Sequence, residues 1–275
     1  MKAIDWRLRP PFGSFKGCSV YNAAVNDPKF KAPNAAKVFS MELLIEEMDA
    51  ADIAIGVVPI RQENDNNDIA RIKEQYPGRF EGLAHIDPFD TEKAIEDVDR
   101  YVVHGVAKGI ILEPGQIFLR DSVVPNHKIM LPIYEKCQKE DIMITLTFGG
   151  LSGRALKYYN PECLDDVAIN FPNLRLVLTH GGWPYTTETC WIAYHRTNIS
   201  LSPDYWMMSI NPGHQDYVIA ANNYLRKQII WGSVYPAIDL KWAIDDLRRV
   251  GVNENVLPDI LYHNAAKMLK LPDED

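Results

Sequence analysis

The chain has 275 residues, of which 47% are hydrophobic and 24% charged, and its formal net charge is −8. The negative charge argues against nucleic acid as the partner, because backbone phosphates would be repelled. No run of about 18 apolar residues is present, so we expect no membrane span. The four cysteines lie far apart without a C-x-x-C pair, which argues against zinc ribbons and redox motifs and favours a reducing, cytoplasmic setting.

The chain opens on the stretch AIDWRLRPP (3–11), in which apolar and charged residues alternate. Residues two apart lie on the same face of a strand, so the pattern predicts one apolar face and one face that carries Asp5, Arg7 and Arg9. We expect this charged row to point into the fold.

After a polar loop that we expect to reach about residue 38, short apolar runs alternate with amphipathic stretches. We expect helix N-caps at Ser40 and at Asp90 or Thr91, and Pro161 at a first helical position. The further expected strands are 53–60, 80–87, 107–114, 142–150, 174–182, 198–204 and 228–236. The expected helices are 40–53, 66–76, 90–103, 130–140, 161–171, 213–225, 239–250 and 259–270.

Eight strands that alternate with helices favour a parallel sheet covered by helices. Eight such units in one chain of this length suit a closed (β/α)8 TIM barrel, a single domain over residues 1–275. A doubly wound open sheet is the alternative. That fold would need a glycine-rich phosphate turn after the first strand, and the turn here reads RPPFGSF.

In a barrel of this kind, active sites lie at the carboxyl ends of the strands. Each expected strand places a polar or aromatic residue there, and these residues are Arg7, Arg9, Arg61, His85, Asp87, Glu113, Thr147, His180, Ser202, Asp204 and Tyr235. The sequence therefore predicts one site that draws on all eight strand ends.

The two N-terminal arginines allow two interpretations. An arginine stays protonated and cannot ligate a metal, and a buried one needs an anion beside it. A bound carboxylate or phosphate would match the planar guanidinium of Arg7 or Arg9. Asp5 and Glu113 could instead complete a purely structural ion network.

His180 ends the run LVLTHGG, and the glycines after it let a ligand come close. Histidine suits proton transfer near neutral pH, so His180 is the candidate acid or base, unless it only bonds a neighbouring carboxylate. Glu113 is either a general base or the counter-ion of an arginine. Trp183, Trp206 and Tyr235 could form the wall of a pocket for a planar substrate, or pack in the core.

Several motifs resemble the amidohydrolase-related TIM-barrel family that contains aminocarboxymuconate-semialdehyde decarboxylase-like enzymes. PNLRLVLTHGGWP is similar to the family's sixth-strand motif. QIIWGSVYP is similar to its eighth-strand motif, usually Phe-Gly-Ser-Asp-Tyr-Pro, and ILYHNAAKMLKL to its closing helix. The resemblance implies a TIM barrel with hydrolase or carboxy-lyase activity.

Most of the metal ligands that the family uses are replaced. Its first strand usually reads Asp-x-His-x-His, and the positions of these metal-binding histidines match Arg7 and Arg9. The fifth-strand histidine matches Thr147, the eighth-strand aspartate matches Val234, and only His180 carries over. One histidine cannot hold a catalytic zinc, which takes about three protein ligands, and two guanidiniums would repel it. We therefore expect no metal and no other cofactor.

The sequence thus predicts a metal-independent, amidohydrolase-related hydrolase. Arg7 and Arg9 would bind the anionic group of a small carboxylated substrate, and His180 would be the acid or base. Glu113 and Asp204 would orient these groups. The residues expected around the substrate are Arg61, His85, Thr147, Trp183, Asp204 and Tyr235.

Three alternatives remain open. They are a decarboxylase of the same family, a non-catalytic anion-binding protein, and a rearranged metal site through His180, His85, Asp87 or Glu113. We expect a small anionic molecule as the partner, and neither nucleic acid nor membrane. A homo-oligomer remains open.

Overall fold

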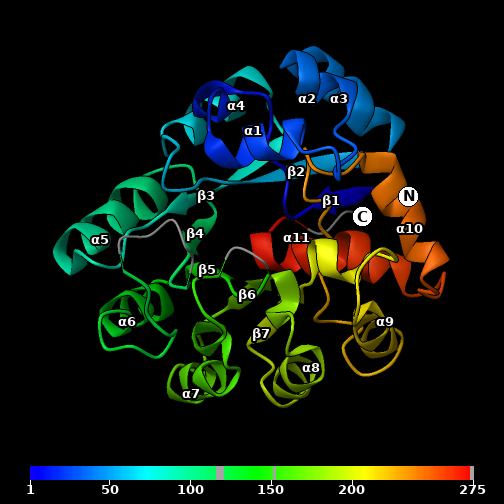
Figure 1. Cartoon of the computed structure of the whole chain (residues 1–275). Coiled ribbons are helices and arrows are strands. Elements are labelled where there is room, and N and C mark those ends of the chain that lie inside the picture. The colour runs from blue at the N-terminus through cyan, green and yellow to red at the C-terminus, as the bar shows by residue number, and fades with distance from the viewer. Residues whose placement is uncertain (116–120, 151–152, 273–275) are drawn as a thin grey trace.

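The computed structural model describes residues 1–115, 121–150 and 153–272. Seven strands form one parallel sheet whose spatial order follows the chain order (Figure 1). Parallel neighbours need a crossover between them, and helices supply most of these crossovers. The strands are β1 (Ala3–Asp5), β2 (Ile53–Pro59), β3 (Phe80–His85), β4 (Gly109–Leu112), β5 (Met143–Thr147), β6 (Leu176–Thr179) and β7 (Ile199–Ser202).

An eighth segment closes the sheet between β7 and β1. The Ile230 N–H donates to the carbonyl of Leu201 in β7 at 2.8 Å, and the Trp6 N–H donates to the carbonyl of Trp231 at 3.1 Å. The fold is therefore the predicted TIM barrel. The predicted strand 228–236, however, forms only isolated bridges to its neighbours, because Val234 adopts a left-handed backbone that no regular strand contains.

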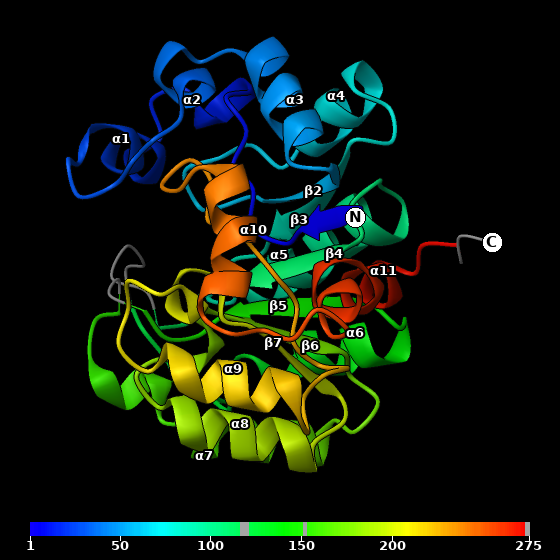
Figure 2. The same ribbon diagram turned by 90° about the vertical axis from the view of Figure 1, so that its right-hand side faces the viewer.

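Helices surround the barrel in both views (Figures 1 and 2). No helix among the described residues combines the length and the apolarity needed to cross a membrane. The helices are α1 (Ser19–Asn26), α2 (Asn34–Val38), α3 (Met41–Ala50), α4 (Asp68–Gln75), α5 (Thr91–Val98), α6 (Leu131–Lys139), α7 (Glu162–Asn170), α8 (Thr186–His195), α9 (His214–Asn222), α10 (Leu240–Arg249) and α11 (Asn264–Leu269).

Two helical regions differ from the sequence-based expectation. The expected polar loop before residue 38 contains α1 and α2. Helix α8 was not predicted, because its apolar residues lie on both faces: Ile192 is buried, whereas Trp191 and Tyr194 are each 55% exposed. Such a helix has no apolar stripe of the usual width.

The predicted caps of two helices are confirmed. The Ser40 side chain accepts a hydrogen bond from the Leu43 N–H at 3.3 Å at the start of α3. The Asp90 side chain accepts one from the Lys93 N–H at 3.1 Å at the start of α5. Pro161 lies one residue before α7 rather than inside it.

The interior of the barrel has its own apolar cluster, which includes Ile4, Trp6 and the α11 residues Met268 and Leu269. In Figure 2 the strand arrows point away from α11, so this helix covers the amino ends of the strands. The carboxyl ends lie at the opposite face. Charged and polar side chains fill that face.

The predicted alternation along the first strand is wrong beyond Asp5. β1 ends there, and Trp6 and Arg7 form a turn. As a result Leu8 packs in the outer cluster between strands and helices, not in the interior cluster of Ile4 and Trp6. The turn places the Arg7 side chain at the carboxyl end of the barrel.

Candidate active site at the carboxyl ends of the strands

Arg7, His180 and Asp204 form a connected array across the mouth of the barrel. The Arg7 Nη2 lies 3.2 Å from the His180 Nε2. The His180 Nδ1 lies 3.1 Å from the Asp204 Oδ1, and the Arg7 Nε lies 3.6 Å from the Asp204 Oδ2. The Arg7 residue is 1% exposed and Asp204 is 4% exposed. The carboxylate thus fixes both the imidazole and the guanidinium.

Arg61, Glu113 and Thr147 form a second group in the same mouth. The Arg61 Nη2 lies 2.6 Å from the Glu113 Oε1. The Thr147 hydroxyl donates to the same oxygen at 3.3 Å. Of the two roles that the sequence allows for Glu113, the geometry favours the counter-ion.

Arg9 differs from the other two arginines. Arg9 is 3% exposed, and its Nε is buried without a hydrogen-bond partner. Within the described part of the chain it forms no ion pair. Burial, followed by repulsion from Arg7 and Arg61, holds the pKa of Arg9 well below its ordinary value. Arg9 is therefore a buried cation without a direct counter-ion.

Asp5 has a structural partner that sequence reasoning missed. Its carboxylate accepts hydrogen bonds from the Arg7 N–H at 3.0 Å, from the Ser233 N–H at 2.8 Å and from the Ser233 hydroxyl. Burial raises the pKa of Asp5, and these hydrogen bonds oppose that shift. The Asp5 carboxylate ties the first strand to the closing segment, which positions the arginine that follows. Ser233 in the motif WGSVYP was the sequence feature from which this partner could have been predicted.

Three residues at consecutive strand ends have left-handed backbones. The φ angles are 65° for His180, 47° for Asp204 and 63° for Val234. Such conformations cost free energy for residues other than glycine, and they are often found at functional sites. Val234 is the most strained of the three, because its side chain is β-branched.

Gly150 allows the β5 loop to approach His180. A Cβ at this position would lie 3.1 Å from the His180 Cδ2 and 3.2 Å from its Cγ. The Gly150 N–H also donates to the carbonyl of Trp183 at 3.1 Å. A side chain at Gly150 would displace the imidazole.

The environment keeps the two candidate histidines neutral. Burial lowers the pKa of His180, and Arg7 opposes protonation while Asp204 favours it. Burial also lowers the pKa of His85. For Asp204, burial alone would raise the pKa, but His180 and Arg7 outweigh it and lower the pKa. A neutral imidazole can accept a proton, so His180 suits a general base.

Other predicted site residues have different surroundings. The His85 Nε2 is buried without a partner, and Glu113 and Arg61 are the charged groups that affect its pKa most, in opposite directions. Trp183 stacks on Trp206 with ring centroids 3.8 Å apart.

Tyr235 lies beside Arg9 through its backbone, because its carbonyl accepts a hydrogen bond from the Arg9 N–H at 3.2 Å. Its ring packs in the outer cluster, and its hydroxyl faces Glu47 of α3. Tyr235 lies in an irregular segment and is followed by a proline. The alternation of side chains along a strand, from which its place in the site was predicted, therefore does not apply.

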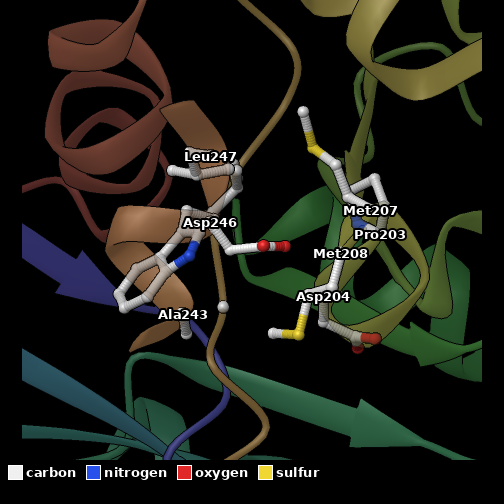
Figure 3. Close-up of a pocket in the computed structure, with 10 residues that line it drawn as sticks. Pro203, Asp204, Met207, Met208, Ala243, Asp246 and Leu247 are labelled. Carbon is white, nitrogen blue, oxygen red and sulfur yellow. The ribbon is translucent and has the colours of Figure 1, made fainter. Parts of the chain in front are cut away.

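A small cavity lies behind Asp204, between the 203–208 segment and α10 (Figure 3). Met207, Met208 and Leu247 make much of its wall, and in the figure the Asp204 carboxylate points away from Asp246.

A family model described as amidohydrolase matches residues 32–271. The chain belongs to the amidohydrolase family. Membership in this family indicates an enzyme of the hydrolase or carboxy-lyase type. No curated protein matches the chain.

Solved structures share the fold over nearly the full chain. An uncharacterised TIM-barrel protein from Bordetella bronchiseptica has 30% identity and a TM-score of 0.90, over 98% of this chain and 99% of that chain. A 2,6-dihydroxybenzoate decarboxylase from Rhizobium has 14% identity and a TM-score of 0.73, over 98% and 99%. A dihydroxybenzoic acid decarboxylase from Polaromonas, with bound manganese and an inhibitor, has 14% identity and a TM-score of 0.75, over 99% and 98%. The two decarboxylases show the fold alone.

The residues of this amidohydrolase do not fit a manganese ion of that kind. Arg7 and Arg9 are cations at the positions that the sequence resemblance aligns with the family's metal-binding histidines, and the same resemblance aligns Thr147 and Val234 with two further ligand positions. No three His, Cys, Asp or Glu side chains within the described ranges are grouped as metal ligands. Divalent cations need such oxygen or nitrogen donors. The donor set thus disagrees with a metal centre.

Proposed function

We propose that this amidohydrolase is a metal-independent hydrolase of a small carboxylated compound. The observation that carries the proposal is the Asp204–His180–Arg7 array, with 3.1 Å and 3.2 Å between the partner atoms. A carboxylate that orients an imidazole is a common arrangement for a general base. The adjacent guanidinium supplies fixed positive charge where a hydrolytic transition state develops negative charge.

The hydrogen-bond partners assign the tautomer of His180. The Nδ1–H donates to the Asp204 carboxylate, so the lone pair is on Nε2, which accepts from Arg7. In the proposed reaction the substrate takes over this Arg7 donor. The Nε2 then accepts a proton from a water molecule, whose oxygen forms a bond to the substrate carbonyl carbon. The carbonyl electron pair moves to oxygen beside Arg7 and returns when the leaving group departs with the proton from His180.

The rest of the mouth would bind and orient the substrate. Arg9 would hold its anionic group, because its guanidinium is buried and unpaired. Arg61 is held by Glu113 and would add positive charge without moving. The stacked pair of Trp183 and Trp206 would contact a planar part of the substrate.

Decarboxylation is the second candidate, because two of the structural neighbours are named as decarboxylases of dihydroxybenzoates. It would use the same arginines to bind the carboxylate that departs. Without a metal or another electron sink, however, the carbanion left by carbon dioxide has little stabilisation, so we favour hydrolysis. The two reactions give different products from the same type of acid.

The cellular setting is part of the same proposal. All four cysteines are free. This supports a reducing, cytoplasmic compartment.

The test is an activity screen on purified protein. The panel would hold lactones and esters with a free carboxylate, together with dihydroxybenzoates, and would follow hydrolysis and carbon dioxide release separately. We expect hydrolysis that survives a metal chelator and falls at least about a hundredfold in His180→Asn. The matched control is His195→Asn on the exposed side of α8, which should keep full activity. Loss of activity on chelation, with stoichiometric manganese or zinc before it, would refute the metal-free proposal.

Activity that survives His180→Asn would refute the role of the imidazole. Binding of anions without turnover of any substrate would favour the non-catalytic alternative.

A further inference from the structure

Among the described residues of the mouth, two arginines lie beside a carboxylate and a third does not. Arg61 pairs with Glu113 at 2.6 Å, and Arg7 lies 3.6 Å from Asp204. Arg9 has no direct anionic partner among the described residues, although it is 3% exposed. The mouth therefore has one guanidinium that a ligand can pair without displacing a protein group.

Arg7 and Arg9 present buried donors from which a carboxylate can accept hydrogen bonds. The Arg9 Nε and the Arg7 Nε and Nη1 are buried without hydrogen-bond partners, although the Arg7 Nε lies 3.6 Å from the Asp204 Oδ2. A carboxylate has two oxygens, each of which accepts such a donor. Arg7 and Arg9 repel one another, and an anion between or beside them would relieve that repulsion.

Among the described residues of the mouth, a second ionised group on the ligand would find no unpaired arginine. Asp204 and Glu113 both act on Arg9 electrostatically, so both carboxylates would also repel a second negative charge beside it. They already occupy Arg7 and Arg61. Another negative charge there would meet two like charges in a poorly solvated site.

We propose that the substrate is a monocarboxylate whose single charged group pairs directly with Arg9, and that a second ionised group beside it prevents binding. This inference rests on the proposed function, since it names the substrate class of the same site. It makes Arg9 the residue that determines charge specificity.

The experiment measures binding, so that it is independent of turnover. Two ligand series of constant skeleton are titrated by calorimetry: acetate, acetamide and malonate, and benzoate, benzamide and isophthalate. The concentrations extend to about 10 mM, a range suited to ligands of so few atoms. We expect at least one monocarboxylate to bind, and its amide and its dicarboxylate to bind at least about tenfold more weakly.

Two variants complete the test. Arg9→Met should lose at least about tenfold in monocarboxylate affinity while it keeps a cooperative thermal transition. Arg248→Met is the matched control, because its guanidinium is on the surface and pairs with Glu254 at 2.8 Å. It should bind like the unaltered protein.

Three results would overturn the inference: no monocarboxylate binds, a dicarboxylate binds as tightly as its monocarboxylate, or Arg9→Met binds unchanged. If binding follows the expectation and no substrate is turned over, the proposed hydrolase function fails and the charge specificity stands.

Discussion

Replacing Arg9 with methionine should make the ligand-free protein more stable. The guanidinium is nearly completely buried, has no counter-ion among the described residues and is repelled by Arg7 and Arg61. Methionine keeps much of the volume and removes the charge. Replacing buried ionic groups with apolar ones has been neutral or has stabilised proteins by about 1–4 kcal/mol.

The matched comparison is Arg61→Met, in which the opposite result is expected. Arg61 lies 2.6 Å from the Glu113 carboxylate, which is 2% exposed, so its loss leaves a buried charge unpaired. Breaking such a pair costs about 3–5 kcal/mol. Both substitutions replace a buried arginine of the mouth with methionine. They differ in whether a buried carboxylate is left without its partner.

Thermal unfolding followed by fluorescence or calorimetry measures both effects. For a chain of this size about 1 kcal/mol corresponds to roughly 2–4 °C in Tm. We expect Tm to rise by about 2–16 °C in Arg9→Met and to fall by about 6–20 °C in Arg61→Met. A fall in Arg9→Met similar to that in Arg61→Met would refute the reasoning, because it would mean that Arg9 has a protein anion as its direct partner.

Three further predictions can be tested by comparing purified variants with the unaltered protein. Asp204→Asn should lower kcat by about a hundredfold or more, because the His180 imidazole loses its acceptor, while the conservative Asp204→Glu should recover part of the loss; equal activity in all three proteins would count against the array. Val234→Asn should raise the free energy of unfolding by about 1 kcal/mol, since asparagine tolerates the left-handed backbone and a β-branched residue does not; a lower urea midpoint would contradict this. The folded-state pKa values of His85 and His180 are lowered by burial, so below pH about 6.5 the unfolded chain takes up protons that the folded protein does not. Stability should therefore be full above that pH and fall as the pH is lowered from about 6.5 to 5.5 in urea titrations, with a smaller fall in His180→Asn.

The barrel could be predicted from the sequence because each buried strand is a short apolar run. Parallel strands covered on both faces carry such runs, and turns and caps separate them from helices. The Ser40 and Asp90 caps were predictable for a local reason, since the capping side chain and the amide it bonds are three residues apart. Helix α8 could not be found in this way, because its apolar residues on both faces give no helical period.

The site was predictable only in part. Strand position identified His180 and Glu113 as candidates. Their partners lie far away in the sequence, since Asp204 is 24 residues from His180 and Arg61 is 52 residues from Glu113. No local pattern encodes which carboxylate meets which guanidinium. The predicted place of the Tyr235 side chain depended on strand alternation, which a residue on an irregular segment does not follow. The unpaired state of Arg9 is a property of the assembled mouth and could not be predicted from one strand.

The pairing of arginines with carboxylates in this mouth also limits which single substitutions the chain can accept during evolution. Converting Arg7 to histidine would strip Asp204 of a neighbour, and converting Arg61 would strip Glu113. Each exchange on its own produces a less stable intermediate without completing a cation-binding set. On the proposed metal-free site, a chain with this arrangement could acquire a metal centre only through several coordinated replacements, because each single replacement lowers its stability.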